Sequence, residues 1–182
     1  NGPAAPNATG LEVDKMNCEH LESHFDAFIG KLWRGLSESE KETLKYVVAD
    51  SYETGSENWT DDFAQSFRRR YGYDPTPYLP TLSGRVVGSA EQSNRFLWDL
   101  RRLVADRIAR DYVGCLSDLS NEHGMQMWLE NYGHWGFPSE FLKYGGQTDL
   151  VSGEFWVDGL GYIECRAASS ASNIYGKERT FA

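Results

Sequence analysis

Short apolar runs alternate along this chain with longer stretches in which apolar residues recur at helical spacing. Strands that are separated by helices form right-handed βαβ units and therefore a parallel sheet. The apolar runs predict strands at residues 11–14, 46–50, 125–130, near 151–156 and from residue 179. The helical stripes predict helices over residues 18–35, 60–71, 89–124 and 166–175. An α/β fold is therefore expected.

Capping residues mark several of the expected helix ends. Asn17 and Ser89 stand directly before apolar stripes, where a side-chain oxygen can accept hydrogen bonds from the first free backbone N–H groups. Residues 37–40, Ser-Glu-Ser-Glu, match the capping-box pattern that starts a short helix. Gly72 is expected to end the helix before it, and Gly114 to interrupt the long helix over residues 89–124.

Carboxylates at several expected strand ends favour a (β/α) barrel over a doubly wound sheet. Chemistry in (β/α)8 TIM-type barrels gathers at the carboxyl ends of the strands, and the glycine patterns GxGxxG and GxxxxGK[ST] of nucleotide-binding folds are missing. About five strands are visible where a barrel needs eight, so only part of the barrel is expected here. Residues 1–10 are expected to form a linker or loop, and residues 11–182 a partial barrel from a longer parent chain. Such a piece alone would leave strand edges open and is expected to be inactive.

Composition excludes several classes of partner. The 182 residues carry a net charge of −9, which argues against nucleic acid or an anionic membrane surface. No run of about eighteen apolar residues and no signal peptide is present, so no membrane span is predicted. Aromatic residues make up 14% of the chain and include six Trp, so some are expected to line a binding surface. The three cysteines, Cys18, Cys115 and Cys165, are widely spaced and odd in number, and are expected to be buried apolar fillers rather than a disulfide or metal site.

The stretch 125–138 says most about function. An apolar run ends there in Glu130, and a loop of aromatic residues, glycines and His134 follows. A strand would thus deliver a carboxylate to an aromatic-lined crevice, which suits a sugar, because its C–H faces stack on rings while its oxygens need polar partners. The alternative is a structural glutamate satisfied by backbone amides beside core aromatics. His134 is a candidate substrate contact in the same loop.

Further carboxylates lie at or just after the expected strand ends. Hydrolysis of an acetal needs one carboxylic acid to protonate the leaving oxygen and a second carboxylate that acts as base or nucleophile. The candidates are Asp14, Asp50, Glu53, Glu130 and Glu154, with Glu164 at a loop-to-helix junction. The spacing of His20 and His24 would also let two imidazoles bind a metal from one helical face, but no third ligand is evident and a solvated face is favoured.

Four segments of the chain resemble a known family. Residues 48–60, 71–80, 128–136 and 153–156 are similar to the catalytic domain of the α-L-rhamnosidases of glycoside hydrolase family 106. The resemblance implies a (β/α)8 catalytic barrel within a large multidomain bacterial enzyme, inversion at the anomeric carbon, and a calcium ion that helps to hold the rhamnose hydroxyls. It also implies a rhamnose-containing glycan or glycoside as substrate, the remaining domains of the parent chain as partners, and a periplasmic or secreted parent.

Site residues follow from carrying the motifs onto this sequence. The resemblance implies acid, base or calcium-ligand roles for Glu53, Glu130 and Glu154, without assigning each role. The residues expected to contact the sugar are Trp59, Tyr132, His134, Trp135 and Trp156. Two rivals remain. A non-catalytic carbohydrate-binding module would use the aromatic residues without a proton-transfer pair, and a metal-dependent hydrolase would be centred on the two helical histidines.

Overall fold

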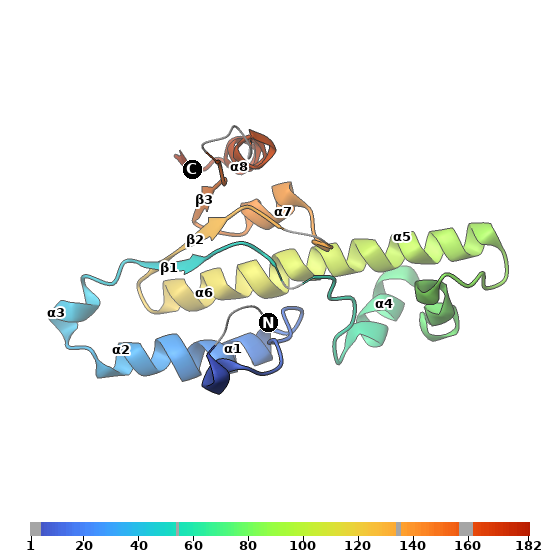
Figure 1. Cartoon of the computed structure of the whole chain (residues 1–182), viewed down its shortest axis with the longest axis horizontal. Coiled ribbons are helices and arrows are strands. Elements are labelled where there is room, and N and C mark those ends of the chain that lie inside the picture. The colour runs from blue at the N-terminus through green and yellow to red at the C-terminus, as the bar shows by residue number, and fades with distance from the viewer. Residues whose placement is uncertain (1–4, 54, 134–135, 157–161) are drawn as a thin grey trace.

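A four-stranded parallel sheet forms the centre of the computed structural model, which describes residues 5–53, 55–133, 136–156 and 162–182 (Figure 1). The strand order is β1-β2-β3-β4, and all three pairings are parallel. The strands are β1 Tyr46–Ala49, β2 Gln126–Glu130, β3 Leu150–Ser152 and β4 Thr180–Phe181. The α/β class with a parallel sheet, expected from the alternation, is thereby confirmed.

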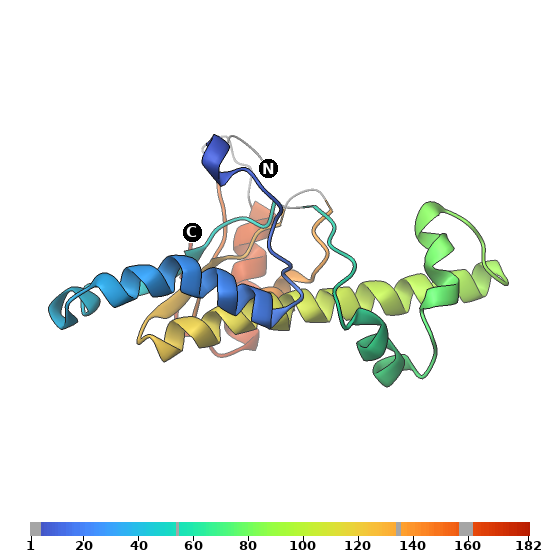
Figure 2. The same ribbon diagram turned by 90° about the horizontal axis from the view of Figure 1, so that it is seen from below.

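Helices connect the strands and cover one face of the sheet. A first helical segment comprises α1 Cys18–Phe25, η2 Asp26–Gly30 and α2 Lys31–Gly35. A long rod comprises α5 Ala90–Arg107, η4 Ile108–Gly114 and α6 Cys115–Glu122, and Figure 2 shows the first segment running beside the α6 half of this rod. The shorter elements are η1 Pro6–Ala8, α3 Glu38–Lys41, α4 Phe63–Tyr71, η3 Thr76–Ser83, α7 Phe141–Gly146 and α8 Tyr162–Ile174.

The expected helix caps are present. The Asn17 side chain accepts hydrogen bonds from the N–H groups of Glu19 and His20, and Ser89 accepts one from the backbone of the residue three positions on. The capping box at residues 37–40 is reciprocal, and Gly72 ends α4 in the left-handed region with φ of 79°. The expected interruption at Gly114 is wrong: this glycine is helical, and the rod continues through it because the residues on either side, Val113 and Cys115, are buried and hold the helix in place.

Two strand predictions are corrected. Residues 11–14 form no strand, because Leu11 is fully exposed and buries nothing, while the Asp14 carboxylate accepts hydrogen bonds from the backbone of Met16 and the hydroxyl of Thr60. The third strand ends at Ser152 rather than near residue 156. Because residues 11–14 form no strand, the sheet has four strands among the described residues instead of about five.

The two faces of the sheet differ in burial. Ala49, Met127, Leu129 and Val151 are buried beneath the helices and join the main core. The opposite face carries apolar side chains that no described helix covers. These side chains belong to Tyr46, Val48, Trp128, Leu150 and Phe181, of which Val48 is 63% exposed. Ring contacts of 6.2 Å between Tyr46 and Trp128 and of 4.9 Å between Trp128 and Phe181 make this face continuous.

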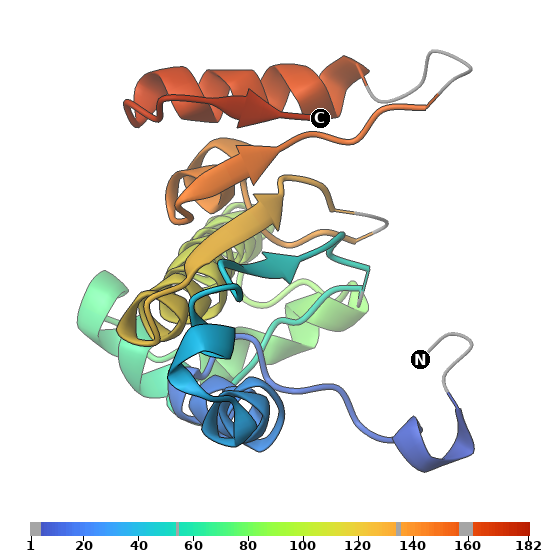
Figure 3. The same cartoon turned by 90° about the vertical axis from the view of Figure 1, so that its left-hand side faces the viewer.

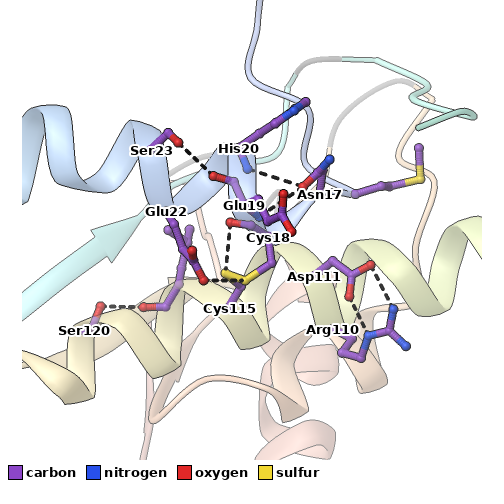
Figure 4. The surroundings of a disulfide bond; sticks show 12 residues. Asn17, Cys18, Glu19, His20, Glu22, Ser23, Arg110, Asp111, Cys115 and Ser120 are labelled. Carbon is purple, nitrogen blue, oxygen red and sulfur yellow. Dashed lines mark hydrogen bonds and ion pairs between the residues drawn. A yellow bond between two sulfur atoms is a disulfide. The ribbon is translucent and has the colours of Figure 1, made fainter. Parts of the chain in front are cut away.

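A disulfide overturns the expectation for two of the cysteines. Cys18 at the start of α1 is bonded to Cys115 at the start of α6, with 5.9 Å between the Cα atoms (Figure 4). The bond forms because α1 packs along α6 and brings together residues that are 97 positions apart. Cys165 is a free, half-buried thiol in α8. None of the helices in the described ranges is both long and apolar enough to cross a membrane.

Candidate active site

Acidic side chains gather at the carboxyl edge of the sheet. Asp50 directly follows β1, Glu130 is the last residue of β2, Glu154 follows β3 by two residues, and Glu164 lies in the first turn of α8. Figure 3 shows the strand arrows pointing the same way, so the residues that follow them meet at one edge. The predicted placement at or just after strand ends is confirmed for Asp50, Glu130 and Glu154, and Glu164 lies at the start of a helix, as predicted.

Glu130 has a raised pKa. Burial raises the pKa of its carboxyl to about 6, and the neighbouring charges of Asp50 and Glu154 act in the same direction. The hydroxyl of Ser51 donates a hydrogen bond of 2.6 Å to Glu130 Oε2, and this bond lowers the pKa in opposition to them. A general acid requires a carboxyl group that stays protonated to a higher pH than usual.

Tyr132 follows Glu130 by two residues, and the charges of several carboxylates act on its phenol. Its N–H donates to the carbonyl of Glu130 at 2.8 Å, and its carbonyl accepts from the N–H of Tyr52 at 3.1 Å, so the backbone continues the pairing beyond the strand ends. Burial raises the pKa of its phenol, and nearby carboxylates raise it further. Those carboxylates are Glu154, Glu53, Glu164 and Glu130. The charges of all three predicted catalytic glutamates therefore act on this phenol.

A buried lysine beside the edge was missed by the sequence analysis. Lys15 is only 5% exposed, and its amino group lies 2.9 Å from a carboxylate oxygen of Glu12 and 4.0 Å from one of Glu57. Its backbone N–H also donates to Glu57 at 3.1 Å, while burial raises the pKa of that carboxyl. A single lysine in a loop has no periodic signal, so only its burial in the folded chain reveals it.

Tyrosine rings connect this lysine to the strand-end carboxylates. The Lys15 amino group lies 5.9 Å from the ring centre of Tyr52 and 5.8 Å from that of Tyr112. Burial raises the pKa of Tyr112 to about 12, and the charges of Glu12, Glu57 and Asp50 add to the effect. The charge of Asp50 thus acts both on Tyr112 and on Glu130.

The predicted sugar contacts have different placements. Tyr132 lies among the carboxylates, whereas Trp59 is 39% exposed and packs on Phe63 of α4 with ring centres 4.8 Å apart. Trp156 is 57% exposed and lies two residues beyond Glu154. His134 and Trp135 lie outside the described residues.

The two helical histidines do not assemble a metal site. His20 faces Asp61 at 3.7 Å and Asp14 at 4.0 Å, and it forms no ligand group with His24. Among the residues that the structure describes, potential ligands converge only at Cys18, Glu22 and Cys115, and these two sulfurs are bonded to each other. Within the described ranges, the metal site predicted at His20 and His24 therefore lacks a third ligand.

Several carboxylates lie at one edge of a parallel sheet, and burial raises the pKa of one of them, Glu130, to about 6. Hydrolysis of an acetal requires two carboxyl groups, one of which acts as an acid. The family model for α-L-rhamnosidase matches residues 1–182, and the chain belongs to this family of glycoside hydrolases. The resemblance inferred from the four sequence motifs is thereby confirmed.

Two proteins are similar to this chain over nearly its whole length. A solved structure, a rhamnosidase from Novosphingobium sp. PP1Y, superposes with a TM-score of 0.82 at 30% identity and matches 99% of this chain but 18% of that one. A protein of Formosa agariphila named "Putative beta-glucuronidase" is 35% identical over 177 residues, which are 97% of this chain and 15% of that protein. The chain thus spans less than a fifth of the length of either relative.

Proposed function

We propose that this chain supplies part of the catalytic domain of a glycosidase that removes terminal α-L-rhamnose from glycans or glycosides. The single observation that carries the proposal is Glu130, whose pKa is raised to about 6 among carboxylates that follow neighbouring strands. A sugar-binding module that only stacks rings on its ligand has no use for such a group.

Glu130 is the proposed proton donor to the glycosidic oxygen, because its carboxyl stays protonated to a higher pH than an ordinary glutamate. The leaving alcohol departs with that proton while a water attacks the anomeric carbon from the opposite face. A second carboxylate, for which Glu53 and Glu154 are the candidates, takes the proton of the attacking water. Attack from the opposite face gives inversion, in agreement with what the family resemblance implies.

The uncovered face of the sheet supports the partial-barrel interpretation. In a closed (β/α)8 barrel, one face of the sheet contacts the helices and the other lines a packed interior. Val48, Trp128 and Leu150 lie in register on adjacent strands and form an apolar layer suited to such an interior. We propose that further strands of the complete protein pair with β1 and β4 and cover this face.

The donor chemistry of the edge also suits calcium. This hard cation takes oxygen ligands only, and carboxylates are the strongest of them. Asp50 and Glu130 lie close enough for the charge of one to raise the pKa of the other, an arrangement that a divalent cation would relieve. Asp50 and Glu154 are therefore the residues that would hold the ion, which leaves Glu130 free as the proton donor, and the proposed contribution of the ion is to fix the rhamnose hydroxyls.

The stereochemistry of the product tests the proposal. Proton NMR of the complete protein acting on an aryl α-L-rhamnoside should show β-L-rhamnose as the first sugar formed, before mutarotation. Exhaustive chelation should abolish turnover, and added calcium should restore it. Release of α-L-rhamnose would contradict inversion, and full activity after chelation would contradict the calcium site.

The disulfide is informative about the cellular compartment of the complete protein. Such bonds persist in oxidising compartments and are rare in the reducing cytosol. The Cys18–Cys115 bond therefore supports the proposal that the complete protein is periplasmic or secreted.

A further inference from the structure

A pocket lies beside the active-site edge, between the middle of α5 and two loops. Its volume is about 580 Å³, within the usual range for pockets that hold small ligands. One wall is formed by the loop at residues 56–58, another by residues 136–140, and the floor by Trp98, Arg101 and neighbouring residues of α5. Of the described residues predicted to contact rhamnose, Trp59, Tyr132 and Trp156, none lines it.

The pocket adjoins the carboxylate edge through shared residues. Ser56 donates a hydrogen bond of 3.0 Å to the carbonyl of Gly136 and so joins the two loops. Phe137 lies in the pocket wall, and its ring also contacts Tyr52 with centres 5.4 Å apart. Glu57 lines the pocket and accepts the backbone N–H of Lys15 at the active-site edge. A unit linked to the rhamnose can therefore extend toward this pocket.

The charged side chains that line the pocket indicate which class of ligand it would bind. Glu140 lies 2.6 Å from Arg102, which also contacts Asp106 at 3.2 Å, and Glu57 is held by Lys15. These charged groups already have partners. Arg101, by contrast, forms no hydrogen bond or ion pair with the part of the chain that the structure describes, although the protein has a net charge of −9. Its guanidinium is free to bind a carboxylate in a bidentate manner.

The exposed aromatic residue of the pocket, Trp98, suits the apolar C–H face of a sugar. Trp98 lines the pocket and is 71% exposed, so its ring is accessible to a ligand in the pocket. Trp98 and Arg101 are three residues apart on α5, so their side chains are neighbours on one helix face. An indole that stacks on a ring of C–H groups and an arginine beside it match a sugar that carries a carboxylate.

We propose that this pocket is a subsite for a uronic acid unit of the substrate, bound by Arg101 through its carboxylate and by Trp98 through its ring face. The inference rests on the proposed function, because it names the unit to which the rhamnose is attached. It makes the protein selective for rhamnose linked to an acidic sugar.

Binding to the complete protein tests the subsite without requiring turnover. Isothermal titration should give methyl β-D-glucuronide an affinity at least about tenfold higher than methyl β-D-glucoside, since a hydrogen bond to a charged group contributes about 1.5–3 kcal/mol. Arg101→Gln should remove this difference, and Trp98→Ala should weaken binding of both sugars. The matched control is Arg95→Gln, on the same helix, where Arg95 is paired with Glu91 and does not line the pocket.

Kinetics separate the two proposals. The wild-type protein should cleave a rhamnosyl glucuronide with a kcat/KM at least about tenfold above that for the matching rhamnosyl glucoside, and Arg101→Gln should equalise the two. Selective binding without cleavage of any rhamnoside would refute the proposed function and leave the subsite standing. Equal affinity for the two methyl sugars, an Arg101→Gln variant that remains selective, or a Trp98 shielded by another segment of the complete protein would overturn the subsite.

Discussion

Glu130 shows how neighbouring residues can set the protonation of one side chain. Burial and the charge of Asp50 favour its neutral form, and the Ser51 hydroxyl favours its charged form. A carboxyl that acts as proton donor is active while protonated, so activity should be present below its pKa and fall as the pH rises through about 6.

Two substitutions should move this limb of the pH profile in opposite directions. Asp50→Asn removes a charge that raises the Glu130 pKa, so the fall in kcat/KM should shift to lower pH. Ser51→Ala removes a hydrogen bond to the charged form, so the fall should shift to higher pH. The measurement is kcat/KM against pH for the complete protein and both variants. Shifts of the same sign would show that the limb does not report on Glu130.

At the scale of elements, Gly153 positions the residue that follows it. It lies between the end of β3 and the first turns of α8, and its N–H donates to the carbonyl of Phe181 in β4 at 2.9 Å. A Cβ atom at this position would lie 2.5 Å from the Cα of Cys165, and backbone cannot move aside as a flexible side chain can. The glycine thus permits the close approach of α8 that places Glu154 and Glu164 at one edge.

Gly153→Ala should therefore destabilise the protein and displace Glu154. The expected loss is about 1–3 kcal/mol of unfolding free energy, the usual cost of overpacking, with lower turnover in the folded fraction. Gly35→Ala is the matched control, because a Cβ there meets nothing within 4 Å. Denaturant titration and activity assays provide the comparison. Equal stability of the two variants would refute the packing argument.

Local signals explain which elements the sequence could predict. The caps at Asn17 and at residues 37–40 depend on bonds within one turn, so they are visible in the sequence. The short helix α7 escaped prediction because six residues, two of them glycines, show no helical period. The Cys18–Cys115 bond and the buried Lys15 depend on contacts between distant segments, which spacing alone does not reveal.

Some features of the candidate site could likewise be predicted from the sequence, and others could not. The strand-end position of Glu130 followed from its apolar run and is confirmed. The pKa of Glu130 is raised mainly by burial and further by Asp50 and is lowered by Ser51, and no pattern within residues 125–138 could show these effects. The catalytic and calcium-binding roles of Glu53, Glu130 and Glu154 stay predictions, as does the part of rhamnose binding assigned to His134 and Trp135.

Across the whole molecule, one covalent bond joins the first helical segment to the long rod. A disulfide that closes a loop of about 100 residues stabilises by at most about 4–5 kcal/mol in the chain-entropy model, and the two cysteines here are 97 positions apart. The helices that it joins cover the buried face of the sheet, so the bond stabilises the support of the active-site edge.

Cys18→Ser with Cys115→Ser should lower the unfolding free energy by several kcal/mol while leaving the carboxylate edge intact in the folded protein. Cys165→Ser is the control, because that thiol is free. Peptide mapping without reductant should recover residues 18 and 115 in one linked pair. Recovery of both as free thiols from protein purified under oxidising conditions would contradict the bond.

The central claim is that the carboxylates at the sheet edge carry out glycoside hydrolysis, and Glu130→Gln in the complete protein tests it most directly. The amide keeps the shape of the side chain but cannot donate a carboxyl proton, so turnover of an α-L-rhamnoside should fall at least about a hundredfold, the scale expected for losing a general acid or base. Glu122→Gln, an exposed change at the end of α6, should leave turnover unchanged. Near wild-type turnover by a correctly folded Glu130→Gln protein would contradict the account.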